Sequence, residues 1–143
     1  MPLLKFYEIN WLAVVVAAVV AFLVGGVWYQ ALFGKLWLKL HAYTPEQERA
    51  LKARRPPALF FGGMIVSYLV LALVMALLIG ALPEKTPVIG AAIGVLVWLG
   101  PAAAIGMTGW LASDKAFGIY LIDIGCELVY LILMGLILGG WRS

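Results

Sequence analysis

The sequence has few charged residues, one cysteine and one histidine. Only 12% of its 143 residues are charged, whereas 65% are hydrophobic. This composition excludes a soluble domain, because the exterior of a soluble domain must face water. With Cys126 alone, the chain has neither an intramolecular disulfide nor a thiolate metal cluster. The single histidine, His41, lies in a polar connection, which argues against histidine-based acid–base chemistry within the membrane.

The sequence also lacks the short motifs of common enzymes and nucleotide-binding proteins. It contains no phosphate-binding loop, no paired Cys or His at metal-ligand spacing, and no nucleophile elbow around a serine. We therefore expect no enzymatic activity, no metal site and no cofactor. The net charge of +3 reflects membrane topology and not a nucleic-acid partner, since almost all the basic residues lie outside the apolar runs.

Four long apolar runs take up most of the chain. They cover roughly residues 9–34, 58–82, 87–112 and 117–141, and each exceeds the ~18 residues that indicate a membrane-spanning helix. No Lys or Arg occurs in their interiors, and little sequence remains for a separate soluble domain. The sequence therefore predicts an all-α fold, a polytopic four-transmembrane-helix bundle in one membrane domain over residues 1–143, with the lipid bilayer as its surroundings.

The distribution of basic residues predicts the orientation of the bundle. Seven of them lie in the first and third connections, and three lie on the other side: Lys35, Lys39, Arg49, Lys52, Arg54, Arg55 and Lys115 against Lys5, Lys85 and Arg142. By the positive-inside rule, the first and third connections face the cytoplasm and both termini face outward. Arg54 and Arg55 directly precede the second run, where we expect them to meet anionic lipid headgroups.

The first connection, residues 35–57, contains the signals of a short helix. Thr44 is an N-cap residue, Pro45 follows at the first helical position, and Gln47 stands where a capping box has its partner. The helix has to end before Pro56, because a proline ring disfavours helix in the residue before it. We expect this short helix to lie at the membrane interface.

Several residues predict how the spans begin, bend and pack. Asn10 is placed to cap the first helix. The two prolines between the second and third runs predict a tight turn, with these spans as antiparallel neighbours. Pro101 predicts a kink in the third span that frees carbonyl groups for a neighbour, water or an ion.

The fourth run contains two acids. Helical spacing places Tyr120, Asp123, Glu127, Tyr130 and Met134 on one stripe. At 1.5 Å per residue, the two acids lie about 10 and 16 Å from the start of the helix. Acids in hydrocarbon are costly and mark functional sites, so this stripe has to face the bundle interior, a water-filled cavity or a partner subunit.

Three roles remain open for the acid pair. Asp123 and Glu127 bind or relay a proton, a cation or a cationic solute; or they dock a partner that supplies a basic residue; or they form a buried hydrogen-bonded network. We place the site between the fourth span and the kinked third span. The candidate ligand residues are Asp123, Glu127, Tyr120 and Tyr130. The residues expected to support them are Pro101, Ser67, Tyr68 and Asn10.

The chain resembles a family of small bacterial membrane proteins known as domain of unknown function 1761. The resemblance rests on four segments: Ile9-Asn10-Trp11-Leu12-Ala13-Val14, Gly25 through Trp37, Trp98-Leu99-Gly100, and Leu133 through Gly139. It implies a four-helix bundle in the bacterial cytoplasmic membrane, with no activity established for the family. It also implies asparagine near position 123 and an uncharged residue or histidine near position 127, from which the two acids depart.

The sequence thus leads to two functional hypotheses. In the first, the protein is transporter- or channel-like and handles a proton, a cation or a small cationic solute, as a homo-oligomer. In the second, it is an accessory or structural subunit of a larger membrane complex, with no ligand of its own.

Overall fold

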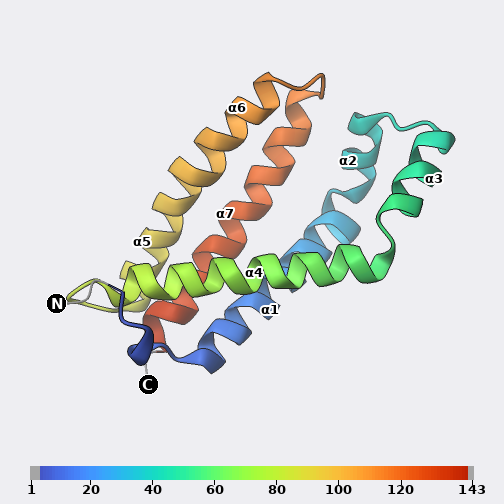
Figure 1. Ribbon diagram of the computed structural model, residues 1–143. Coiled ribbons are helices and arrows are strands. Elements are labelled where there is room, and N and C mark those ends of the chain that lie inside the picture. Colours follow the sequence, from blue (N-terminus) through green and yellow to red (C-terminus); the bar gives the residue numbers. More distant parts are fainter. Residues whose placement is uncertain (1–3, 142–143) are drawn as a thin grey trace.

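The computed structural model describes residues 4–141, and these form helices with no β-strand among them (Figure 1). Four helical stretches are long and apolar enough to cross a membrane: Trp11–Leu32, Pro57–Gly80, Pro87–Leu111 and Phe117–Gly140. Their ends lie within two residues of the predicted ends. The predicted all-α, polytopic fold class is confirmed.

The helices follow one another with short connections. Their bounds are η1 Phe6–Glu8, α1 Trp11–Val27, η2 Trp28–Leu32, α2 Gly34–His41, α3 Pro45–Arg54, α4 Pro57–Gly80, α5 Pro87–Val97, η3 Trp98–Ala104, α6 Ile105–Leu111 and α7 Phe117–Gly140. η1 is a 3₁₀ turn, whereas η2 and η3 are π-helical segments that continue α1 and α5. The first span is therefore α1 with η2, and the third is α5, η3 and α6.

Glycines bring α5 and α7 into close contact along their length (Figure 1). Gly90 faces the backbone of Gly135, and Gly94 faces the carbonyl of Leu131, so that a Cβ at either position would collide with the α7 main chain. Small residues at a helix interface allow such close backbone approach in membranes. The glycine pairs of the third and fourth spans thus form one packed interface.

The apolar core joins α1, α4 and α7. Its residues are fully or almost fully buried: Ala13, Ala17 and Ala21 from α1, Ala72, Met75 and Ile79 from α4, and Leu131, Met134 and Leu138 from α7. The small alanines let α1 approach its neighbours, while the larger side chains of α4 and α7 fill the space between them. This core occupies the half of the bundle that contains the start of α1 and the ends of α4 and α7.

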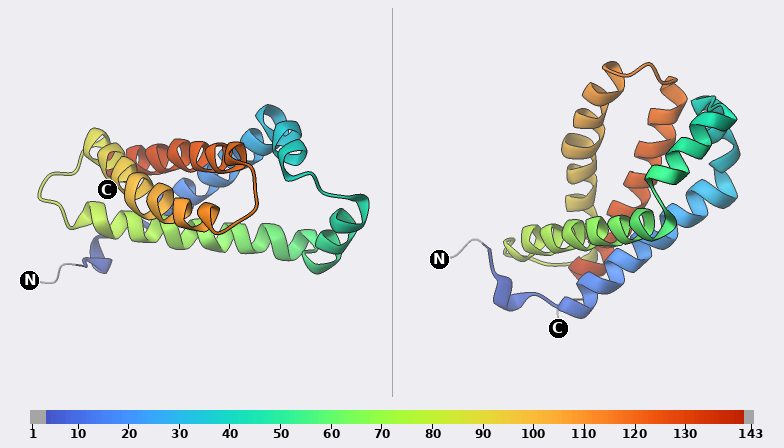
Figure 2. Two further views of the ribbon diagram at one scale, coloured as in Figure 1. Left: turned by 90° about the horizontal axis from the view of Figure 1, so that it is seen from above. Right: turned by 45° about the vertical axis from the view of Figure 1, so that its right-hand side comes forward.

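The other half of the bundle is open on the side of α4. Residues 57–63 at the start of α4 are all exposed, and α4 and α5 run apart from the turn that joins them (Figures 1 and 2). The expectation that the second and third spans pack as antiparallel neighbours therefore holds only near the turn. The reason is that glycines draw α5 onto α7, as described above.

The first connection consists of two short helices. The Thr44 hydroxyl accepts a hydrogen bond from the Gln47 N–H at 3.1 Å, and the Gln47 side chain accepts one from the Thr44 N–H at 2.9 Å. This capping box is the predicted one, and α3 ends at Arg54, before Pro56. The sequence-based interpretation missed α2, which follows the first span after Phe33 and ends at left-handed Ala42.

Candidate functional site at the α1–α7 junction

Asp123 is held by two aromatic donors from the end of the first span and from α2. The Tyr29 hydroxyl donates to Asp123 Oδ1 at 2.5 Å, and the Trp37 indole N–H donates to the same oxygen at 3.1 Å. Hydrogen bonds to a charged acceptor are among the stronger ones, and both partners here are partly buried. Asp123 therefore joins three elements: η2, α2 and α7.

Trp28, next to Tyr29, reaches α7 as well. Its indole N–H donates to the Ile122 carbonyl at 2.9 Å, and its ring lies against Gly125, where a side chain would crowd it. Trp28 and Tyr29 both belong to η2, and π-helical turns occur frequently at functional sites. We call Trp28, Tyr29 and Trp37 the aromatic clamp, because together they fix the first span and α2 to α7.

The third span binds the same segment of α7 from another direction. The Trp98 indole donates to the Ile124 carbonyl at 2.7 Å, and the Tyr120 hydroxyl donates to the Ala103 carbonyl at 2.5 Å. Ala103 and Trp98 both lie in η3, the π-helical segment that contains Pro101. The bend expected at Pro101 thus takes the form of a π-helical segment, and one of its carbonyls is used by a neighbouring helix.

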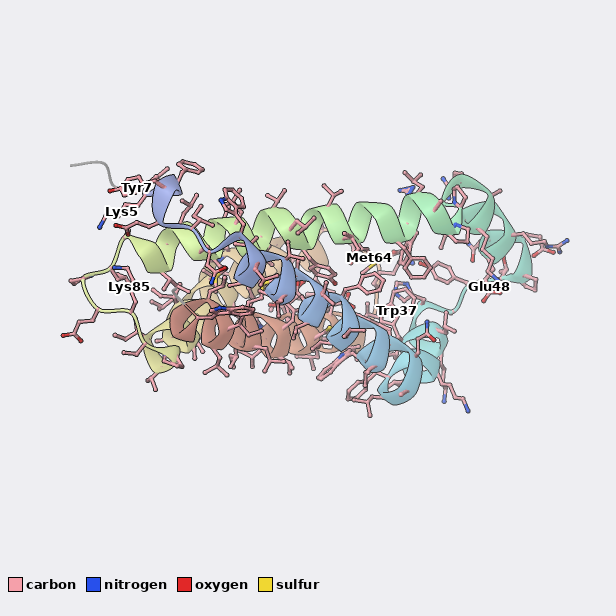
Figure 3. All side chains as sticks on the ribbon, turned by 90° about the horizontal axis from the view of Figure 1, so that it is seen from below. Lys5, Tyr7, Trp37, Glu48, Met64 and Lys85 are labelled. Carbon is pink, nitrogen blue, oxygen red and sulfur yellow. The ribbon has the colours of Figure 1, made fainter. Side chains whose placement is uncertain are left out.

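An aromatic stack extends from the clamp into the first connection. The His41 ring lies between Trp37, at 3.9 Å between ring centroids, and Tyr43, at 4.9 Å. Lys115 Nζ lies 5.2 Å from the Tyr43 ring centroid, so the first and third connections meet at one end of the molecule. In Figure 3, Trp37 and Glu48 lie at this end, and Lys5 and Lys85 at the opposite end.

His41 is poorly suited to carry a charge in this stack. Both of its ring nitrogens are buried and have no hydrogen-bond partner among the residues that the structure describes. Burial lowers the pKa of His41, nearby Lys115 lowers it further, and Asp123 acts in the opposite direction. The imidazole is therefore favoured in its neutral form.

Glu127 differs from Asp123 in its surroundings. Its Oε2 atom is buried and accepts no hydrogen bond within the described part of the chain. On α7, Asp123 lies about one turn before Glu127 and Tyr130 about one turn after it, and the Tyr130 ring packs against Tyr68 of α4. A buried acceptor without a donor costs about 1–3 kcal/mol, and more when it is charged. Glu127 is therefore the acid with unused capacity to bind.

Tyrosines and the apolar core border Glu127 on the side away from the clamp. The Tyr68 and Tyr130 rings pack edge to face, with centroids 5.2 Å apart, and link α4 to α7. Leu131 and Met134, about one and two turns further along α7, are fully or almost fully buried. The acid thus lies between the aromatic clamp and the closed half of the bundle.

The residues of the stripe expected on α7 contact three different parts of the bundle. Tyr120 faces η3, Asp123 faces the first span and α2, and Tyr130 faces α4. The expectation that the acids lie between the third and fourth spans is therefore wrong for Asp123. It turns to the opposite neighbour because Tyr29 and Trp37 supply the donors.

The supporting residues Asn10, Ser67 and Pro101 lie away from the acids. Asn10 caps α1 and accepts from the Ala13 N–H at 3.1 Å, separated from Tyr29 by all of α1, about 26 Å at 1.5 Å per residue. Ser67 is exposed and donates to the Gly63 carbonyl of its own helix at 2.8 Å. Pro101 is exposed and borders an apolar depression between α4 and the third span.

The described residues contain no group of three His, Cys, Asp or Glu side chains able to hold a metal ion. Cys126 is buried in α7 next to Glu127. The acid pair is thus set among aromatic and apolar side chains, an arrangement suited to a proton or a single positive charge and poor in oxygen ligands.

The aromatic clamp escaped the sequence-based interpretation, although its residues stood out. By sequence alone, Trp28 and Trp37 stand near the end of the first span, where interfacial aromatic residues usually lie. A tryptophan near a membrane surface and a tryptophan that donates to a neighbouring helix look alike in one sequence. The sequence feature that could have indicated the clamp is the concentration of aromatic residues within residues 28–37.

Comparison with known proteins identifies the family. The family model described as "Protein of unknown function (DUF1761)" matches residues 12–139, which include the clamp, both acids and the α5–α7 interface. A search of curated proteins and one of solved structures gave no match. Since the family model covers nearly the whole chain, the protein belongs to the DUF1761 family.

Proposed function

We propose that this protein is a small transporter- or channel-like membrane protein in which Glu127 binds a proton, a cation or a small cationic solute. One observation carries the proposal: Glu127 Oε2 is buried and has no donor among residues 4–141, whereas Asp123, one turn away, already accepts two hydrogen bonds. An acid at membrane depth costs about 2.5–3.5 kcal/mol on insertion scales. No Lys or Arg occurs in the four spans to neutralise it.

The two acids have different roles in this proposal. Asp123 is a positioning residue that holds the first span and α2 against α7. Glu127 is the binding residue. Loss of Glu127 therefore removes the function and leaves the fold, whereas loss of Asp123 loosens the junction of three elements.

The proposal includes a membrane setting. The protein lies in a bacterial cytoplasmic membrane, with the first and third connections in the cytoplasm and the termini outside, and Arg54 and Arg55 contact anionic lipid headgroups. The chain works as a homo-oligomer, because four helices enclose little volume, and it has no enzymatic activity and no cofactor. The meeting of Lys115 with Tyr43, which places two basic connections at one end, supports this orientation.

Flux in proteoliposomes tests the proposal. Wild type, Glu127→Gln and the control Glu48→Gln, an exposed acid of α3, are reconstituted with an internal pH dye and exposed to proton and cation gradients. We expect a flux in wild type and in Glu48→Gln that is lost in Glu127→Gln, with equal helix content in all three. Equal flux in Glu127→Gln would overturn the proposal. No flux in wild type, together with a co-purifying membrane subunit, would instead favour an accessory role.

A further inference from the structure

The packing around Glu127 leaves little space for a ligand at its unbonded oxygen. Oε2 is buried and accepts no hydrogen bond from residues 4–141. Two apolar depressions lie elsewhere on the bundle, one between α4 and the third span and one against Val129 and the end of the first span, and Glu127 lines neither. A ligand with a volume of its own would therefore have to displace neighbouring side chains to reach Oε2.

The site also offers few oxygen ligands to a metal ion. Ca²⁺ takes six to eight oxygen ligands, and Mg²⁺ requires a near-ideal octahedron of them. Among the described residues, no group of three acidic, histidine or cysteine side chains comes together. Asp123 Oδ1 already accepts hydrogen bonds from Tyr29 and Trp37. A metal ion that gave up its water at Glu127 would thus receive too few oxygen atoms in exchange.

No cationic side chain within the spans compensates a negative charge on Glu127. Besides Glu127, the titratable side chains of the four spans are Tyr29, Tyr68, Tyr120, Asp123, Cys126 and Tyr130. Asp123, one turn before Glu127, accepts two hydrogen bonds, as an ionised carboxylate does. Two like charges at this helical spacing repel each other. A negative charge on Glu127 would therefore be both unpaired and repelled.

A proton removes this charge and needs no cavity, because it forms an O–H bond on the carboxyl group itself. Burying an unpaired charge costs more than burying an unpaired neutral group, so a buried carboxylate without a partner tends to neutralise. Uptake converts the carboxylate and a hydronium ion into a carboxylic acid and water. Release reverses this step, and no electrons are transferred in either direction.

From this geometry we propose that the ligand of Glu127 is a proton, which the side chain holds as a carboxylic acid at neutral pH and exchanges with water. The inference rests on the proposed function in one respect, that Glu127 is the binding residue, and narrows the ligand to the proton. Asp123 keeps its negative charge and its two donors, so the two acids of α7 differ in protonation.

Infrared spectroscopy of the full chain in detergent at pH 7 tests the protonation of Glu127. A carboxylic acid has a C=O stretch distinct from the carboxylate bands, and ¹³C labelling of glutamate carboxyl groups separates it from aspartate. The other glutamates, Glu8, Glu46, Glu48 and Glu84, are exposed to water. We expect a labelled carboxylic acid band in wild type and in the control Glu48→Gln that is lost in Glu127→Gln. Carboxylate bands alone in wild type, or an acid band that persists in Glu127→Gln, would overturn the inference.

Transfer into D₂O separates an exchanging proton from one fixed in the fold. Deuterium lowers the frequency of the C=O stretch of a carboxylic acid, so the Glu127 band should shift when its proton exchanges with solvent. We expect this shift in the folded protein, at unchanged helix content. A band that stays in place until the protein unfolds would show a structural proton and contradict the proposed exchange.

Thermal unfolding in detergent tests the proton against metal cations. A ligand that binds only the folded state raises the unfolding temperature. We compare wild type and Glu127→Gln in sodium, potassium and magnesium chloride at equal ionic strength, and expect the difference between the two proteins to be the same in all three salts. A rise with one of these cations in wild type that is absent from Glu127→Gln would identify a metal ion as the ligand and overturn the inference.

Flux and protonation fail separately. If Glu127-dependent flux is carried by a metal cation and Glu127 is a carboxylate at pH 7, the proposed function stands and the proton is the wrong ligand. If the Glu127 acid band is present and exchanges, and Glu127→Gln retains flux, the proton-binding site stands and the transport role is wrong.

Discussion

Tyr29 donates its hydroxyl to Asp123 Oδ1 at 2.5 Å, joining residues that are 94 positions apart in the sequence. The Trp37 indole adds a second bond to the same oxygen. Asp123, an acid within an apolar helix, thus helps to hold the first span against the fourth at this joint. Oε2 of Glu127, one turn further along α7, accepts no hydrogen bond from the described residues.

The first prediction concerns the stability of this joint. Tyr29→Phe removes the hydroxyl and leaves the Asp123 carboxylate with one donor, so we expect the free energy of unfolding to fall by about 1–3 kcal/mol. In the double variant Tyr29→Phe/Asp123→Ala, the loss should be smaller than the sum of the single losses, because both remove the same bond. Unfolding in a mixed-detergent denaturant titration measures these differences.

Tyr7→Phe is the control for this cycle, because Tyr7 is 74% exposed and lies outside the bundle core. We expect it to change the free energy of unfolding by less than about 0.5 kcal/mol. Strictly additive losses in the Tyr29–Asp123 cycle would contradict the bond.

The second prediction concerns the glycine contact between α5 and α7. In Gly90→Ala the added Cβ meets the Gly135 carbonyl, and neither can turn away, because the Cβ is fixed to the α5 backbone and the carbonyl is part of the α7 backbone. We expect α5 and α7 to separate locally and the free energy of unfolding to fall by about 1–3 kcal/mol or more. The same detergent titration measures this loss.

Gly62→Ala is the matched control, since a Cβ at Gly62 on α4 meets nothing within 4 Å. There the change replaces glycine with a better helix former, which stabilises by about 0.5–1 kcal/mol. Opposite signs for the two substitutions are expected. A neutral Gly90→Ala would show that the α5–α7 interface is looser than the backbone contact implies.

The third prediction concerns pH. The folded protein holds the pKa of His41 below its ordinary value of 6.5, through burial and Lys115, so below about pH 6.5 the unfolded chain binds a proton more readily than the folded one. The free energy of unfolding should therefore be unaffected by His41 above this pH and fall as the pH decreases. The slope reaches at most ~1.4 kcal/mol per pH unit.

Comparison of the pH profiles of wild type and His41→Phe separates the contribution of His41 to the pH dependence of unfolding from the contributions of the acids. His41→Phe keeps a ring between Trp37 and Tyr43, and we expect it to lose the slope between pH 6.5 and 5. Lys115→Gln should reduce the slope, because it removes a charge that opposes protonation of His41. Identical pH profiles for wild type and His41→Phe would exclude this role.

The fourth prediction concerns α3, an exposed helix that depends on its own cap. Thr44→Ala removes the side-chain half of the capping box, at a cost of about 0.5–2 kcal/mol to the local helix. We expect faster amide exchange at Gln47 and Glu48 and an unchanged global unfolding, because α3 residues are exposed and outside the core. Thr108→Ala, which removes a hydroxyl bonded within its own helix, should leave exchange in α3 unchanged.

Local signals predicted much of the fold. Long apolar runs gave four spans, the Thr44–Gln47 spacing gave the capping box, and Asn10 is the cap of α1 as expected. In each case, residues close together in the sequence form the hydrogen bonds of their own backbone or exclude water. These features therefore form without a contact to a distant part of the chain. The π-helical segments and α2 were missed because they depend on contacts with α7.

The acids show the limit of helical spacing. Spacing placed Asp123 and Glu127 on one stripe, one turn apart, and predicted one environment for both. Asp123 instead accepts hydrogen bonds from Tyr29 and Trp37, while Glu127 Oε2 accepts none within the described part of the chain. Periodicity reports which face of a helix a residue occupies, and the donors on the facing helices determine what that residue can do.

By itself, the sequence determined that the chain crosses a membrane with four helices and carries two acids that need a compensating group, because hydrocarbon excludes charge whatever the packing. Only the tertiary structure decided which acid is already compensated. Tyr29 and Trp37 reach Asp123 because the π-helical end of the first span and the start of α2 turn toward α7. In the same region Trp28 packs against Gly125, a contact between residues 97 positions apart that local sequence cannot specify.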